Sequence, residues 1–255
     1  MRPIQIRVDW SGNVIVGPGL GIFEGFAGDN AEHRHWAHQL TIGRSNEASL
    51  LSRGKRYRSA AIFVRANTPH QLEPGPVLSV YMDPTINLAK RFCQRINEDA
   101  SVEALTDLDI QRLFDRPILS ISAVEIFSIL KHMDSVDNRQ PDDLRLQVVL
   151  ASINEAIRGH REVERGELAA VVSLSPSRFS HWFRQQTGMP LRSYKKWLRL
   201  IHGMNLVFHG HNMTDAAHDS CFSDQAHFSR TFSQAFGISP SNAVAHLKST
   251  ALPRM

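Results

Sequence analysis

The sequence lacks several features of secreted and membrane-embedded proteins. Only two cysteines occur among its 255 residues, Cys93 and Cys221, which excludes a disulfide framework and a zinc site built from cysteines. No apolar run approaches the roughly 18–20 residues that a membrane-spanning helix needs. The N-terminal stretch MRPIQIRVDW has no apolar core typical of a secretory signal. We therefore expect a cytoplasmic protein with no membrane partner.

Acidic residues are missing from one long stretch of the chain. No Asp or Glu lies between Glu167 and Asp215, whereas this stretch contains six Arg and Lys side chains. Residues 144–255 hold thirteen Lys and Arg against seven Asp and Glu, whereas residues 1–143 hold sixteen against eighteen. A basic segment without acids favours a surface that binds phosphates, with a solvated helix face as the alternative. The charge therefore indicates nucleic acid as a partner of the C-terminal half.

One short motif occurs twice in the C-terminal half. FSHWFRQQTG at 179–188 and FSRTFSQAFG at 228–237 both follow the pattern F-S-x-x-F-x-Q-x-x-G. Phe179, Trp182 and Phe183 fall on one face of a helix, because residues three and four apart lie on the same side. The repeated letters therefore predict the buried face of two related helices.

Capping residues predict where these helices begin and end. In the first copy Ser175 is a preferred N-cap and Gly188 is typical of a helix end, and a short apolar helix precedes them. In the second copy we expect Asn212 and Ser223 to cap the two corresponding helices. Each copy thus predicts a helix-turn-helix unit, and the segment 193–210 between the copies predicts one long linker helix.

The C-terminal half resembles the DNA-binding domain of AraC-type transcription regulators, from about residue 143 to residue 248. The residues that carry the resemblance are LSPSRFSHWFRQQTGMPLRSY at 174–194 and FSDQAHFSRTFSQAFGISPS at 222–241. The resemblance implies an all-α domain with two helix-turn-helix units joined by a linker helix. It also implies a sequence-specific regulator of transcription rather than an enzyme.

Three positions depart from the pattern of this family. The family usually has glycine in the turn of each unit, where φ is positive, whereas this chain has Ser173 and Cys221. A non-glycine residue in that conformation costs about 1 kcal/mol or more, so each turn is either strained or built differently. His218 also stands where the family prefers a large aliphatic residue.

Double-stranded DNA is the expected partner of this domain. Arg and Gln side chains can read guanine and adenine in the major groove, and basic side chains nearby would hold the phosphates. On the helical wheel the outward residues differ between the copies, with His181 in the first at the place of Arg230 in the second. The resemblance and the wheel together give the candidate DNA-binding residues: Ser177, Arg178, Ser180, His181, Arg184, Lys195, Lys196, Gln225, His227, Ser229 and Arg230.

The N-terminal half has a different pattern. Short apolar runs between Val14 and Met82, separated by Gly, Pro and Asn, predict the strands of a small sandwich or barrel. Helical patterns follow, and the most polar stretch comes after them. We therefore expect a mixed α and β protein with two domains. Its parts would be a cupin-like, effector-sensing β-barrel at 1–83, a helical dimerisation segment at 84–134, a linker at 135–143 and the all-α DNA-binding domain at 144–255.

Histidines gather in EHRHWAHQL and again in NTPHQL. On a strand, His33 and His35 would share a face. They resemble the first cupin motif, H-x-H-x-x-x-E, with Gln39 in place of the glutamate, and His70 stands roughly where the second motif has its histidine. The resemblance implies an effector pocket at His33, His35, Gln39 and His70, and the three histidines as nitrogen ligands of a divalent metal. Side chains that line a barrel mouth, or ordinary buried histidines, are the alternatives.

Two other functions compete with a ligand-responsive regulator. One is a metal-dependent cupin enzyme that carries a DNA-binding domain, which needs a metal with an open coordination position. The other is an architectural DNA binder whose barrel is filled with side chains. For the regulator we expect a small-molecule effector, RNA polymerase as a further partner, and a homodimer. The apolar stripe around Phe127 and Leu130 fits a partner helix, with packing back on the barrel as the alternative.

Overall fold

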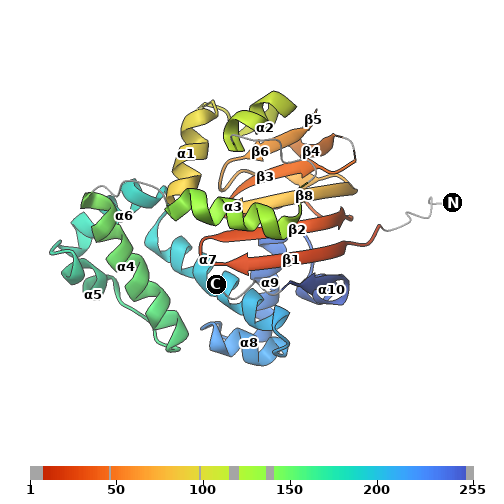
Figure 1. Ribbon diagram of the computed structural model, residues 1–255. Coiled ribbons are helices and arrows are strands. Elements are labelled where there is room, and N and C mark those ends of the chain that lie inside the picture. The colour runs from red at the N-terminus through yellow and green to blue at the C-terminus, as the bar shows by residue number, and fades with distance from the viewer. Residues whose placement is uncertain (1–7, 46, 98, 115–120, 136–140, 251–255) are drawn as a thin grey trace. The chain divides into compact units, whose positions relative to one another are not determined.

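The computed structural model describes residues 8–45, 47–97, 99–114, 121–135 and 141–250 of the chain (Figure 1). Its N-terminal part is rich in strands and its C-terminal part is helical, which confirms the expected mixed α and β class. The chain forms two compact units, Met1–Ser135 with Phe232–Met255, and Val136–Thr231. No helix within the described ranges is long and apolar enough to cross a membrane.

The strands of the first unit form two sheets. Among the described residues they are β1 (Ser11–Gly17), β2 (Leu20–Ala27), β3 (His38–Gly43), β4 (Ala48–Ser52), β5 (Lys55–Ser59), β6 (Ala61–Val64), β7 (Gln71–Leu72), β8 (Gly75–Met82), β9 (Val102–Leu105) and β10 (Leu247–Ser249). The larger sheet has the order β10-β1-β2-β8-β3-β6-β9 and the smaller one β5-β4-β7. Neighbouring strands are antiparallel except β1 and β10, which run parallel.

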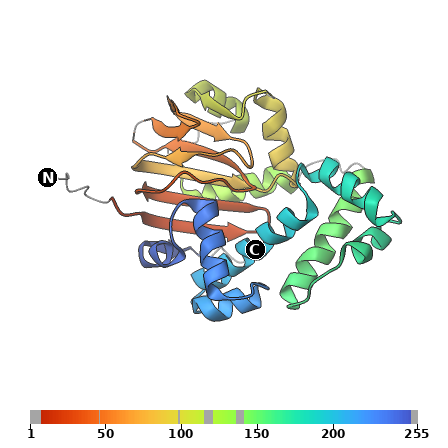
Figure 2. The same cartoon turned by 180° about the vertical axis from the view of Figure 1, so that it is seen from behind.

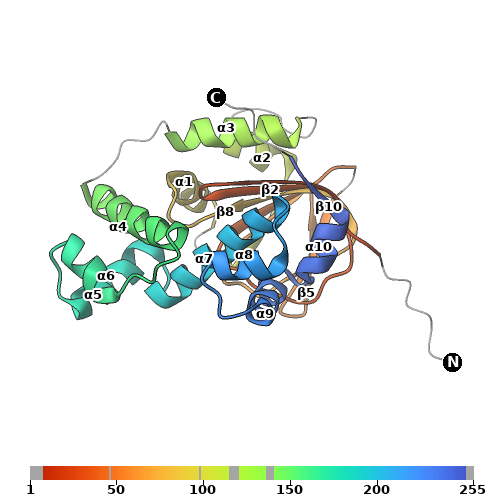
Figure 3. The same ribbon diagram turned by 90° about the horizontal axis from the view of Figure 1, so that it is seen from below.

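Three helices cover one face of the larger sheet, as Figure 3 shows for α2 and α3. They are α1 (Asn87–Arg95), α2 (Asp107–Phe114) and α3 (Ala123–Ser135). Their apolar side chains form a common core with the strands, and Leu40, Phe92 and Leu130 are almost fully buried in it. Phe127 and Leu130 of α3 therefore pack back on the sheet, which was the alternative to a partner helix.

The segment 84–134, expected to be helical, also contains a strand. β9 pairs antiparallel with β6 at the edge of the larger sheet. Val102 and Leu105 of β9 are buried in the first unit. Hydrogen bonding to an open sheet edge thus decided the structure of these four residues, which carry no helical pattern of their own.

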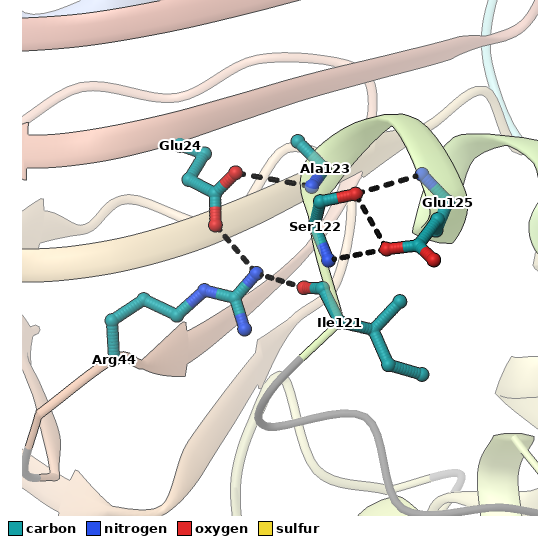
Figure 4. Close-up of polar contacts among 6 residues, drawn as sticks. All are labelled: Glu24, Arg44, Ile121, Ser122, Ala123 and Glu125. Atoms are coloured by element: carbon teal, nitrogen blue, oxygen red, sulfur yellow. Dashed lines mark hydrogen bonds and ion pairs between the residues drawn. The ribbon is translucent and has the colours of Figure 1, made fainter.

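Helix α3 is held to the sheet by a polar contact (Figure 4). Arg44 donates from one Nη to the Glu24 carboxylate and to the carbonyl of Ile121, each at 2.5 Å. The other oxygen of Glu24 accepts the backbone N–H of Ala123, the first residue of α3, at 3.0 Å. A carboxylate from β2 thus satisfies one of the N–H groups that the start of a helix leaves without a partner.

A local capping box supports the same helix end. The hydroxyl and backbone N–H of Ser122 both donate to the Glu125 carboxylate, at 2.7 and 3.1 Å (Figure 4). The backbone N–H of Glu125 donates in return to the Ser122 hydroxyl at 3.4 Å. This reciprocal pair is the S-x-x-E start signal of a helix.

The second unit is helical. It contains α4 (Pro141–Arg158), α5 (Arg165–Val171), α6 (Pro176–Thr187), α7 (Leu191–Phe208), α8 (Met213–Asp219) and most of α9 (Gln225–Phe236); α10 (Pro240–His246) follows in the first unit. Figure 2 shows α7 as one continuous helix, as expected for the linker helix. Of the expected linker 135–143, residues 136–140 lie outside the described residues and 141–143 belong to α4.

The expected caps of the second unit are confirmed with one correction. Ser175 and Asn212 accept backbone N–H groups at the starts of α6 and α8, and Gly188 ends α6 with φ of 73°. At α9, however, the carboxylate of Asp224 accepts the His227 N–H at 2.7 Å. The prediction that Ser223 caps this helix is therefore wrong. Asp224, one residue later, is the cap, and its carboxylate also suits the positive end of the helix dipole.

The division into units differs from the expected boundary at 144–255. The second unit ends at Thr231, so the last turn of α9 and the residues after it belong to the first unit. The physical reason is β10, which adds to the edge of the larger sheet beside β1 and joins the chain's C-terminal part to the strands (Figure 3).

We expect Glu24→Ala to lower the free energy of unfolding by about 1–3 kcal/mol, because it removes the carboxylate that accepts from both Arg44 and the Ala123 N–H. Urea denaturation measures the change. The control is Glu47→Ala, whose ion pair with Arg58 is largely exposed and should contribute less than about 1 kcal/mol. Equal losses in both variants would contradict this account.

Candidate DNA-binding surface and histidine cluster

Helix α6 separates a buried apolar face from an exposed polar one. Phe179 and Phe183 are fully buried, which confirms that the repeated letters build the inner face. Ser180 is half-buried and donates to the carbonyl of Pro176 at 3.0 Å. The candidate DNA-binding residues that are exposed on this helix are Ser177, Arg178, His181 and Arg184.

The second recognition helix, α9, presents fewer candidates to solvent. Gln225 and Arg230 are exposed, whereas His227 and Ser229 are half-buried. The Gln225 side-chain oxygen accepts the hydroxyl of Thr214, a residue of α8, at 2.9 Å. This contact with a neighbouring helix orients the Gln225 side chain, whose amide N–H groups are not used in it. The side chain is expected to read adenine.

The linker helix α7 carries the expected phosphate contacts. Lys196 is exposed. Lys195 is half-buried, and its Nζ donates to the carbonyl of Val163 at 3.0 Å. Arg199, a further basic residue of this stretch, forms an ion pair with Glu162. Of these three cations, Lys196 is therefore the one most accessible to a phosphate.

Both helix-turn-helix turns contain a left-handed residue that is not glycine. Ser173 has φ of 55° and Cys221 has φ of 59°. Their backbone N–H groups donate to Ala170 and His218, at 3.0 and 2.9 Å. The two turns therefore share one geometry and are strained, at a cost of about 1 kcal/mol or more each. His218 is exposed, so it does not occupy the core position of an aliphatic residue.

The histidines of the N-terminal half lie together, although they do not share a strand. His33 and His35 precede β3 in irregular chain, so the expectation that both lie on one strand is wrong. A two-way backbone bridge joins His33 to His70, with N···O distances of 2.9 Å. The ring centroids lie 4.4 Å (His33–His70), 5.2 Å (His35–His70) and 5.9 Å (His33–His35) apart. We call His33, His35, His70 and the adjacent Gln39 the histidine cluster.

Each imidazole of the cluster bonds a backbone carbonyl through Nδ1. The bonds are His33 to Ala31 at 2.9 Å, His35 to Ala37 at 3.0 Å and His70 to Thr68 at 2.8 Å. A carbonyl can only accept, so Nδ1 carries the proton in all three rings and Nε2 keeps its lone pair. A carbonyl that fixes the far nitrogen in this way is the usual partner of a histidine that ligates a metal.

The three rings are neutral near neutral pH. Burial lowers the pKa of His33 to about 3, with a further contribution from His70 nearby. Burial also lowers the pKa of His35 and of His70. A charged imidazole is costly where water cannot reach it, so the Nε2 lone pairs stay available for a cation.

Gln39 connects the histidines to a buried polar chain. Its Oε1 lies 3.0 Å from Nε2 of His35 and 3.0 Å from Nε2 of His70. Its Nε2 donates to Thr41 at 2.7 Å, and Thr41 bonds Ser79 at 3.1 Å. This orientation brings three lone-pair atoms together, which a bound cation would satisfy. An amide turned by 180° would instead donate to both rings.

Polar side chains behind the cluster were not among the expected site residues. Thr41 and Ser79 face each other across β3 and β8, and both are fully buried. Tyr81 lies opposite Gln39 in the same register, and burial raises its pKa to about 12. The alternation of these polar residues with apolar ones such as Leu40 is a period-2 signal that was readable in the sequence.

Comparison with known proteins concerns mainly the C-terminal region. A family model described as a helix-turn-helix domain matches residues 168–245. The HTH-type transcriptional activator RhaS of Klebsiella pneumoniae (strain 342) is 29% identical over 143 residues, which cover 55% of this chain and 50% of that protein. RhaS of Enterobacter sp. (strain 638) is 29% identical over 121 residues, 47% of this chain and 43% of that protein. Residues 168–245 therefore form a helix-turn-helix domain, and the chain is similar to the RhaS activators.

The chain spans about half the length of the curated relatives that it matches. Solved structures of ToxT from Vibrio cholerae cover nearly all of it. An apo ToxT variant has a TM-score of 0.58 and 12% identity, covering 91% of this chain and 99% of that one. Wild-type ToxT bound to an unsaturated fatty acid has a TM-score of 0.53 and 12% identity, covering 97% and 98%. At this identity the likeness shows the two-domain fold alone.

Proposed function

We propose that this chain is an AraC-type, sequence-specific DNA-binding regulator of transcription that senses a small-molecule effector through its first unit. The observation that carries the proposal is the pair of recognition helices α6 and α9, whose buried faces repeat while their exposed faces differ. Matched relatives are named transcriptional activators, which supports it. Because DNA is its target, we place the protein in the cytoplasm.

The exposed side chains divide by their chemistry. Arg230 and Gln225 on α9 and His181 on α6 carry donors that can bond the edges of bases. Arg178 and Lys196 are exposed cations, and they suit phosphates. The half-buried candidates, among them Lys195 with its backbone partner, would contact DNA only after a rotamer change.

The histidine cluster is the proposed effector site of the first unit. The fatty acid in the ToxT structure is a ligand of that protein and supports ligand sensing in this fold. In this chain the three imidazole rings lie 4.4 to 5.9 Å apart, close enough for one ion to contact all three.

A divalent metal is therefore the effector that the cluster fits best. The ligand atoms of His33, His35 and His70 lie within 4.8 Å of one another, and imidazole nitrogens on one zinc ion lie about 3.4 Å apart. Shortening the longest separation between these atoms by about 1.4 Å would complete the set, with the Gln39 oxygen as a fourth donor. Three neutral imidazoles and an amide oxygen suit zinc or a neighbouring transition metal.

A regulator fits these observations better than a metal-dependent enzyme does. Catalysis at the cluster needs an open coordination position that a substrate can reach, whereas His35 and His70 are buried at 3% and 1% exposure. A homodimer and contact with RNA polymerase remain predictions. Phe127 and Leu130 of α3, which were candidates for contact with a partner helix, lie in the core of the first unit.

For the DNA contacts, we expect Arg230→Ala to relax sequence preference at one base pair by about 1–3 kcal/mol, because it removes a donor to a base edge. Lys196→Ala should weaken all sequences alike and reduce the slope of log K against log salt by about 0.9, because it removes one phosphate contact. Binding to a library of duplexes at several salt concentrations measures both effects.

The matched control for this experiment is Arg58→Ala, which removes an exposed cation in the first unit and should leave DNA binding unchanged. If Arg230→Ala and Lys196→Ala shifted every sequence by the same factor, the division into base and phosphate contacts would be wrong.

For the metal, we expect the full chain to bind about one zinc ion, and His35→Gln to weaken binding by more than about 100-fold, since even outer-shell partners contribute about 10–100-fold. Gln39→Glu should tighten binding, because a carboxylate is a stronger donor than an amide oxygen. Zinc titration with elemental analysis measures the stoichiometry. His218→Gln, at an exposed histidine of the second unit, is the control; wild-type protein that binds no zinc would exclude the proposed metal.

A further inference from the structure

The last turn of the second recognition helix belongs to the unit that holds the histidine cluster. α9 begins in the second unit with the candidate base contacts Gln225 and Arg230, and its residues from Phe232 onward lie in the first unit. An α-helix is stiff over such a length, so a movement imposed on its last turn is carried to its first. We call residues 232–250 the C-terminal clamp.

Backbone hydrogen bonds hold the clamp to the sheet. β10 pairs in parallel with β1, and the N–H of Thr250 donates to the carbonyl of Val14 at 2.9 Å. At the other end of the clamp, the N–H of Ala31 donates to the carbonyl of Gly237 at 2.9 Å. These bonds lie at both ends of the clamp, so its position is set by the first unit.

Gly237 packs directly on the histidine cluster. A Cβ at this position would lie 2.4 Å from the Ala31 oxygen and 2.8 Å from Nδ1 of His33. The preceding residue, Phe236, has its ring 5.9 Å from the ring of His35 and 6.3 Å from that of Tyr81. The end of α9 therefore contacts two of the three candidate metal ligands.

We propose that the C-terminal clamp couples occupancy of the histidine cluster to DNA reading by α9. This inference rests on the proposed metal site and DNA-binding function and adds the regulation that joins them. Drawing the imidazole nitrogens together around an ion moves His33, the least buried of the three. His33 and its acceptor Ala31 both contact Gly237. That movement therefore changes the position of the last turn of α9.

The coupling has a thermodynamic consequence. Two ligands that bias one element affect each other's affinity by the same factor, commonly about fivefold or more. Zinc should therefore change the Kd for DNA at least about fivefold, and DNA should change the Kd for zinc by the same factor. Neither ligand needs to contact the other.

The test uses the full chain, zinc chloride, and a duplex selected by the full chain from random sequence. The Kd for the duplex is measured by fluorescence anisotropy with metal-free protein and with one equivalent of zinc. The Kd for zinc is then measured with and without saturating duplex. We expect reciprocal changes in the wild type and their loss in Gly237→Ala, which pushes the end of α9 away from Ala31.

A matched control separates this contact from backbone strain. Gly188 ends α6 with φ of 73°, close to the 70° of Gly237, but a Cβ there would meet nothing within 4 Å. Gly188→Ala should thus keep the coupling. Thr250→Pro, which removes the N–H bonded to Val14 and touches no histidine, should weaken it.

The outcomes distinguish this inference from the proposed function. Wild-type protein that binds zinc and DNA with Kd values independent of each other would overturn the coupling alone. Coupling that persists unchanged in both Gly237→Ala and Thr250→Pro would overturn the role of the clamp. Failure to bind zinc or DNA in the separate titrations would contradict the proposed function and this inference with it.

Discussion

The end of helix α9 depends on one residue without a side chain. Gly237 ends α9 with φ of 70°, and its carbonyl accepts the N–H of Ala31 at 2.9 Å. Positive φ and a backbone approach that leaves no room for a Cβ both require glycine at this position. The same contact joins the end of a recognition helix to the segment that carries His33.

The histidine cluster shows how burial can prepare a site for an ion. Each ring donates a hydrogen bond from Nδ1–H to a backbone carbonyl. Burial lowers the pKa of all three rings. The lone pairs of the three Nε2 atoms then remain in the buried interior of the first unit, where unsatisfied polar atoms are costly. The proposed ion would satisfy them, and its effect on DNA binding would be limited to its differential affinity for the two positions of α9.

The sequence was informative where its signals are local. Ser175, Gly188 and Asn212 cap helices at the expected positions, because capping depends on neighbouring residues. β10 was not predictable, since three residues carry no periodic pattern and its partner β1 lies near the other end of the chain. The members of the histidine cluster could be named, whereas their convergence depends on the backbone bridge between His33 and His70, which has no sequence signal.

Residues 232–250 are held by the first unit, and amide hydrogen exchange tests this assignment. The N–H groups of Ala31, Arg34 and Thr250 each donate to a carbonyl in a hydrogen bond that joins residues 232–250 to the rest of the first unit. NMR of the full chain should find these amides exchanging about 100-fold or more slowly than exposed amides. Exchange at the rate of exposed amides would show that residues 232–250 are not held by the first unit.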